Sequence, residues 1–204
     1  MTLTIWLSLL LICLLGAMSP GPSLAMVAKH SLAGGRKNGL ATAWAHAFGI
    51  GLYALFTILG LAILLHQFPL VFKVITYAGA AYLAWLGFNA IQSKGGIAER
   101  LESGHSCSVA QSAKEGFLIS ILSPKIAIFF TALFSQFVAV SAETSSKAII
   151  VMTPFIVDGL WYTLITFMLS SQLLLATLRN KAHWIDRISG VVLIALALRV
   201  VWVA

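Results

Sequence analysis

The chain has 204 residues, of which 60% are hydrophobic and only 9% are charged, and its formal net charge is +7. Soluble domains carry about a quarter charged residues, so this composition excludes an ordinary soluble protein and predicts a membrane protein. The basic residues are scattered over short segments, which argues against a nucleic-acid-binding surface.

Apolar stretches close to the ~20 residues that cross a bilayer recur along the whole sequence. We predict an all-α membrane protein with six transmembrane helices, at 5–28, 40–65, 74–92, 116–140, 148–170 and 186–204.

The first stretch is interrupted by the sequence AMSPGPSLAMV. Proline removes a backbone donor and clashes with the preceding turn, and lipid offers no water to the freed groups. We therefore predict a broken first helix in which Pro20, Gly21 and Pro22 expose backbone groups to a cavity, with a simple kink as the alternative. A cleaved signal peptide is disfavoured because no charged residue precedes Lys29.

The second stretch, GLATAWAHAFGIG, alternates small and larger residues. One stripe of small residues runs through Gly39, Ala43, Ala47 and Gly51, and a second lies on the opposite side, so we predict a helix pressed between neighbours on two sides. His46, toward the cytoplasmic end of this helix, is either a proton relay or, slightly favoured, a hydrogen-bonded structural histidine.

The segment 93–115 is rich in Gly, Ser and mixed charges, and it predicts a flexible cytoplasmic loop. It separates a first three-helix repeat, 1–92, from a second, 116–204. GLYALFTIL echoes GLWYTLITF, SPG echoes SPK, and Gly79 matches Gly190. An odd number of spans in each repeat inverts the second copy relative to the first.

The fourth stretch carries its own break, at Ser123, Pro124 and Lys125, at a position equivalent to the first break. Broken helices at corresponding places in inverted repeats are typical of secondary transporters. We expect the two breaks to meet near the membrane midplane, where half-helix ends and freed carbonyls bind the charged groups of a small substrate.

The fifth stretch contains an acid near its middle, Asp158. An intramembrane Asp costs ~2.5–3.5 kcal/mol even on insertion scales, so it faces a pathway or a partner. A structural ion pair with Lys125 is the plain alternative. Asp158, Tyr162, Thr166 and Ser170 recur every four residues and share one helix face, which predicts an entry path toward the cytoplasm.

Alternate loops of a six-span chain carry nine and three basic residues. Because basic loops face the cytoplasm, both termini are predicted to lie outside it.

These motifs resemble the lysine exporter and homoserine/threonine exporter family (LysE/RhtB). The resemblance rests on MSPGP, SPKIAIFFTALFSQF, GAAYLAWLG and an acid in the fifth span, and it covers nearly the whole chain. It implies a proton-driven exporter of amino acids or related metabolites in the bacterial inner membrane. It places the family's Pro-Gly-Pro on Pro20 to Pro22, its Asn-Pro-Lys on Ser123 to Lys125 and its acid on Asp158. Ser123 and Ser135 depart from the usual Asn and Pro, which leaves the substrate open.

We therefore predict an exporter rather than an enzyme, with an amino acid and protons as its partners in a lipid bilayer and with no cofactor or metal. The substrate carboxylate would meet Lys125 and its ammonium group Asp158 or freed carbonyls. A metal or other cation exporter of related architecture is the alternative. A thiol–disulfide carrier is disfavoured because Cys13 alone of the two cysteines lies in a predicted span. Homo-oligomerisation stays open.

The predicted topology is tested with reporter fusions. A reporter inserted near Gly104 is expected to read cytoplasmic and one placed after Ala204 is expected to read outside, because of the charge difference between the loops. A cytoplasmic signal from the C-terminal reporter would contradict both the span count and the inverted repeat.

Overall fold

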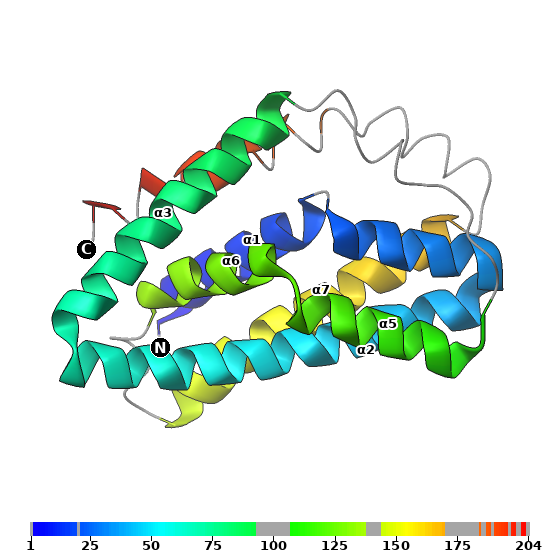
Figure 1. Ribbon diagram of the computed structural model, residues 1–204, viewed down its shortest axis with the longest axis horizontal. Coiled ribbons are helices and arrows are strands. Elements are labelled where there is room, and N and C mark those ends of the chain that lie inside the picture. The colour runs from blue at the N-terminus through cyan, green and yellow to red at the C-terminus, as the bar shows by residue number, and fades with distance from the viewer. Residues whose placement is uncertain are drawn as a thin grey trace.

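The chain folds as a bundle of helices (Figure 1). The computed structural model describes residues 2–19, 21–92, 107–137, 144–169, 184, 187–188, 190–195, 197–198 and 201–202. All regular secondary structure in these residues is helical. The labelled helices are α1 (Leu3–Met18), α2 (Pro22–Gln67), α3 (Pro69–Gln92), α5 (Val109–Ile121), α6 (Pro124–Ser135) and α7 (Thr144–Leu169).

Proline residues determine where several helices begin. Helices α2, α3 and α6 start at Pro22, Pro69 and Pro124. The first turn accepts proline because its N–H would have no intrahelical acceptor and its fixed φ suits a helix. The predicted interruptions of the first and fourth stretches are confirmed, since α1 ends at Met18 before α2 begins and α5 ends at Ile121 before α6 begins.

Helix α2 consists of two helical segments joined at Gly35, which has φ 73° and ψ −170°. No other described residue has a positive φ, and glycine adopts this region without the clash of a side chain. Figure 1 shows the chain turning back where the blue part of α2 ends. The predicted second stretch, 40–65, therefore lies wholly in the part of α2 that follows Gly35.

Helix α5 begins at Val109, before the predicted end of the loop at residue 115. Residues from Val109 to Glu115 are helical, although they fall within the predicted loop 93–115. The side chain of Ser108 caps this helix by accepting a hydrogen bond from the N–H of Gln111 at 3.2 Å. Such a cap satisfies a backbone donor that the first turn leaves unpaired, and so fixes the start of the helix.

Helix α7 has its apolar face outside and its polar face inside. The exposed face carries Ile149, Met152, Ile156, Leu160, Leu164 and Phe167. Asp158, Tyr162 and Thr166 are buried. A helix of a soluble protein shows the reverse arrangement, so the outer surface of α7 is suited to lipid.

By length and composition, helices α2, α3 and α7 can each cross a membrane, among the residues that the structure describes. The pair α5 and α6, bent by 54° at the break, counts as a fourth candidate if it is one span. These apolar helices are those of an all-α membrane protein.

Helix α2 packs between α5 and α7, as its two small-residue stripes predict. On one side Gly49 faces Ser120 and Phe117 of α5. On the other side Gly51 faces Phe155 of α7, where an added Cβ would lie 3.4 Å from the Phe155 Cβ. Small residues let the backbones of these helices approach closely.

Helix α3 packs against described residues near the C-terminus through two glycines. A Cβ at Gly87 would lie 2.6 Å from the carbonyl oxygen of Gly190 and 2.7 Å from Ile194. A Cβ at Gly190 would meet the carbonyl oxygen of Gly87 and Ile91. These contacts are reciprocal, so the backbones at Gly87 and Gly190 lie directly against each other. Gly79, which the sequence analysis matched with Gly190, faces Ala132 of α6.

The packing of α2 against α5 makes Gly116 intolerant of a side chain. A Cβ there would clash with the backbone of Thr42, and overpacking of this kind costs about 1–3 kcal/mol. Gly116→Ala is therefore expected to lower the unfolding temperature of the detergent-solubilised protein, measured by circular dichroism.

Gly60→Ala is the matched control, because a Cβ at Gly60 meets no atom within 4 Å. It should leave the unfolding temperature unchanged or raise it slightly, since alanine favours a helix over glycine by up to ~1 kcal/mol. Equal unfolding temperatures for the two variants would contradict the packing described.

Candidate functional site

The two helix breaks lie in contact with each other. Lys125, in the first turn of α6, donates hydrogen bonds to the hydroxyl of Ser19 at 3.0 Å and to its carbonyl oxygen at 3.3 Å. Ser19 is the residue that follows α1. An added Cβ at Gly21 would lie 3.2 Å from the Lys125 Nζ, so a small residue at this position leaves room for the lysine head group.

The residues at each break satisfy backbone groups that the helix ends leave without partners. The N–H of Ser19 donates to the carbonyls of Leu15 and Gly16. At the second break the Ser123 hydroxyl accepts from the N–H of Ile126 at 3.5 Å and caps α6. Helices α2 and α6 each begin at a break, so the dipole of each helix places partial positive charge there.

Asp158 is paired with a histidine from α2. Its Oδ2 lies 2.7 Å from the Nδ1 of His46, and the His46 Nε2 lies 2.8 Å from the Oγ of Ser23. The His46 and Asp158 residues are 1% and 6% exposed. A buried carboxylate needs such a partner, because an unpaired charge in the interior is costly. The contacts suit an imidazolium that donates to both neighbours, or a neutral ring that donates to Asp158 and accepts from Ser23.

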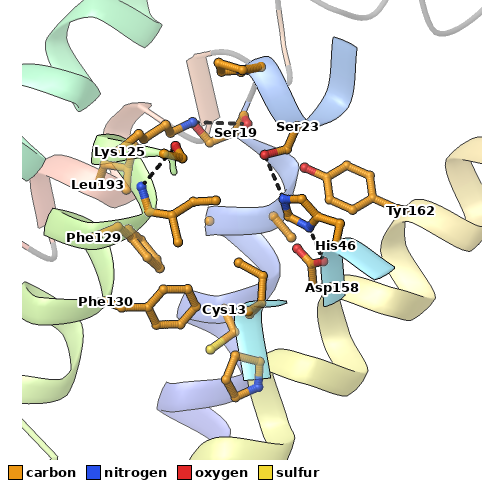
Figure 2. A pocket seen from close by; sticks show the side chains of 18 residues that line it. Cys13, Ser19, Ser23, His46, Lys125, Phe129, Phe130, Asp158, Tyr162 and Leu193 are labelled. Atoms are coloured by element: carbon orange, nitrogen blue, oxygen red, sulfur yellow. Dashed lines mark hydrogen bonds and ion pairs between the residues drawn. The ribbon is translucent and has the colours of Figure 1, made fainter. Parts of the chain in front are cut away.

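Tyr162, one turn beyond Asp158 on α7, covers the other side of the histidine. The Tyr162 and His46 rings meet edge to face with centroids 5.2 Å apart. Figure 2 shows the tyrosine hydroxyl pointing toward Ser23. The histidine is therefore held by contacts with both α7 and the first turn of α2.

These side chains line a cavity of about 60 Å³. Lys125 and Asp158 lie on opposite sides of it (Figure 2). The apolar part of the wall includes Cys13, Ile50, Phe129, Phe130 and Leu193. At ~15 Å³ of such space per water, this cavity holds about four waters.

The structure brings most of the predicted site residues to this one cavity. Its lining includes Gly21, Pro22, Ser123, Lys125, Asp158, Tyr162 and His46. Pro20 lies outside the described residues, and Pro124 is the first residue of α6. The sequence analysis missed Ser19 and Ser23, although both flank the Pro-Gly-Pro motif, and the aromatic pair Phe129 and Phe130.

His46 lies nearer to the start than to the end of the helical segment that follows Gly35. The helical segment that carries it begins just after Gly35, so His46 is about ten residues, or ~15 Å, from its start. The alternative of an ion pair between Asp158 and Lys125 is not what the structure shows, because Asp158 pairs with His46 and Lys125 donates to Ser19.

The predicted entry path along α7 is packed with side chains in this structure. Thr166 is fully buried, donates to the Tyr162 carbonyl at 2.9 Å and lies 3.3 Å from the Ser31 hydroxyl. Ser170 lies outside the described residues. Asp158 and Tyr162 border the cavity, whereas Thr166 forms part of the contact between α7 and α2.

Comparison with known proteins gives matches over most of the sequence. The chain is 30% identical to the leucine efflux protein of Enterobacter sp. (strain 638) over 158 residues, covering 76% of this chain and 71% of that protein. It is 23% identical to the threonine efflux protein of Escherichia coli (strain K12) over 193 residues, covering 92% and 93%. It is 25% identical to an uncharacterized membrane protein of Haemophilus influenzae over 191 residues, covering 91% and 90%.

No solved structure matches the chain. The family described as LysE type translocator matches residues 14–203. That match includes both helix breaks, the Asp158–His46 pair and nearly all of the sequence on either side of them. The chain therefore belongs to the LysE type translocator family.

Proposed function

We propose that this chain exports amino acids or closely related small metabolites across the bacterial inner membrane. The observation that carries the proposal is the cavity between two broken helices, which has Lys125 on one side and the Asp158–His46 pair on the other. Membership of the translocator family and relatives named leucine and threonine efflux proteins support it.

The cavity suits a zwitterion in charge and in size. The carboxylate of an amino acid binds Lys125 and the N-terminal end of α6, whose dipole adds positive charge there. Its ammonium group binds Asp158. In the liquid each water occupies ~30 Å³, so the four waters that fit the cavity take up about the volume of a small free amino acid.

Asp158 and His46 together carry the coupling proton in this proposal. In the proton-loaded state the imidazolium of His46 balances the Asp158 carboxylate across 2.7 Å. An arriving ammonium group takes over this role, and the imidazole then releases its proton. One proton moving down ~150 mV supplies ~3.5 kcal/mol, which exceeds the ~2.7 kcal/mol that a hundredfold solute gradient requires.

Alternating access follows from two inverted three-helix repeats, 1–92 and 116–204. The reciprocal contacts of Gly87 and Gly190 support this arrangement, because they relate α3 to the C-terminal residues by an offset of 103 residues. The two breaks, beginning at Ser19 and Ser123, have almost the same offset. Rocking one repeat against the other would open the cavity to each side in turn. Both termini then lie outside the cytoplasm.

Asp158→Asn tests the coupling role of the acid. The amide keeps the size and hydrogen-bonding capacity of the side chain but cannot balance a proton or an ammonium charge. We expect loss of uphill efflux from amino-acid-loaded cells with downhill exchange retained in part. If Asp158 holds only the ammonium group, binding itself weakens by about 2–5 kcal/mol, as for an unpaired buried charge. Efflux and exchange are measured with a broad panel of labelled amino acids.

Glu102→Gln, which removes an acid from the segment 93–106 outside the described residues, is the matched control and should transport normally. Proton-dependent uphill efflux by Asp158→Asn at the wild-type rate would remove Asp158 from the mechanism. Failure of the wild-type protein to export any amino acid in the panel would overturn the proposed substrate class.

The prolines of the first break are tested together. Pro20→Ala with Pro22→Ala should still insert into the membrane, because alanine favours a continuous helix. Transport should fall severely, since backbone groups freed at the break would be tied back into the helix. Normal efflux by this double variant, at equal protein level in the membrane, would show that the prolines act only as kinks.

A further inference from the structure

A second cluster of polar side chains lies outside the cavity. It joins His30 on α2, Cys107 just before α5 and Glu115 on α5. Cys107 and Glu115 are 77 and 85 residues from His30 in the sequence, which explains why no sequence motif marks the cluster. None of the three lines the cavity with Asp158 and Lys125.

The histidine is the centre of this cluster. It is 1% exposed. Its Nδ1 lies 3.4 Å from the Cys107 Sγ and 3.1 Å from the Ser112 Oγ, and these last two atoms are 3.3 Å apart. Its Nε2 lies 3.0 Å from the Glu115 Oε2. The imidazole thus faces a thiol with one nitrogen and a carboxylate with the other.

The spacing of these groups suits a small metal ion. One nitrogen, sulfur or oxygen atom from each of His30, Cys107 and Glu115 lies within 4.8 Å of the other two. Ligand atoms around a tetrahedral zinc ion are roughly 3.5 Å apart, because Zn–N and Zn–S bonds are ~2.0 and ~2.3 Å long. Because an ion binds only one nitrogen of the His30 ring, either the thiol or the carboxylate must leave its present nitrogen and move toward the other for all three groups to surround one ion.

We propose that His30, Cys107 and Glu115 form a binding site for a divalent cation of the zinc class. Thiolate and imidazole ligands favour zinc and cobalt over magnesium and calcium, which prefer oxygen. Three protein ligands leave the fourth tetrahedral position to water or to the neighbouring Ser112 hydroxyl. Binding releases the thiol proton as the metal–sulfur bond forms, so the affinity rises with pH. The thiolate and the Glu115 carboxylate together balance the charge of the ion.

Neighbouring side chains support the ligands. The carboxylate of Glu115 accepts hydrogen bonds from Lys29 at 2.9 Å and Gln111 at 2.8 Å. Asn38 donates to the Ser112 hydroxyl at 2.8 Å and to the Cys107 carbonyl at 2.7 Å. Outer hydrogen bonds of this kind orient metal ligands. A bound ion would cross-link the segment of α2 before Gly35 to the start of α5.

Cobalt titration of the purified protein in detergent tests the site. We expect one Co²⁺ per chain, a thiolate-to-cobalt charge-transfer absorption, and loss of this absorption when Zn²⁺ is added. Cys107→Ser should abolish the absorption, and His30→Gln should weaken Co²⁺ binding at least tenfold. Cys13→Ala, which removes the other cysteine, should leave the absorption intact.

A second measurement uses the unaltered protein and so does not depend on how the variants fold. Zn²⁺ should slow the alkylation of Cys107, followed by mass spectrometry, whereas Mg²⁺ should not. Absence of the cobalt–thiolate absorption, its persistence in Cys107→Ser, or equal alkylation of Cys107 with and without Zn²⁺ would each overturn the proposal.

Discussion

Backbone groups freed within apolar surroundings must find partners inside the protein, and this constraint shapes the centre of the molecule. Each helix break leaves carbonyls and N–H groups without their intrahelical partners, and lipid supplies none. Lys125 meets part of this need by donating to the Ser19 carbonyl, and Ser123 by capping α6. The Lys125–Ser19 contact therefore stabilises the first break through the second, and it brings a lysine and two helix N-termini to one cavity.

The buried acid is subject to the same constraint. Asp158 sits on the inner face of α7, while the outer face carries large apolar side chains suited to lipid. Its carboxylate is stabilised by His46, which is itself held by Ser23 and the Tyr162 ring. Because Ser23 lies in the first turn of α2, the acid is linked through the histidine to the first break. The pair therefore lies in direct contact with the start of the helix that lines the cavity.

Close helix packing makes this linkage possible. The glycines of α2 allow α5 and α7 to approach it from two sides, and the same helix presents His46 to Asp158 and Asn38 to Ser112. Two polar clusters of different chemistry result. One, around Asp158 and Lys125, borders a cavity, and the other, around His30 and Cys107, joins α2 to α5 without contributing to that cavity.

The sequence by itself determined the helical class, the two breaks and the buried acid, because proline chemistry, apolar length and the cost of a charge in lipid act locally along the chain. It also carried the family resemblance. Only the tertiary structure decided the partners: His46 for Asp158, 112 residues away, Ser19 for Lys125, 106 residues away, and Gly190 for Gly87. These pairings depend on how the helices rotate and slide against one another. Small residues at helix contacts and the chain reversal at Gly35 set that geometry, and no local sequence pattern reveals which distant residues it brings together.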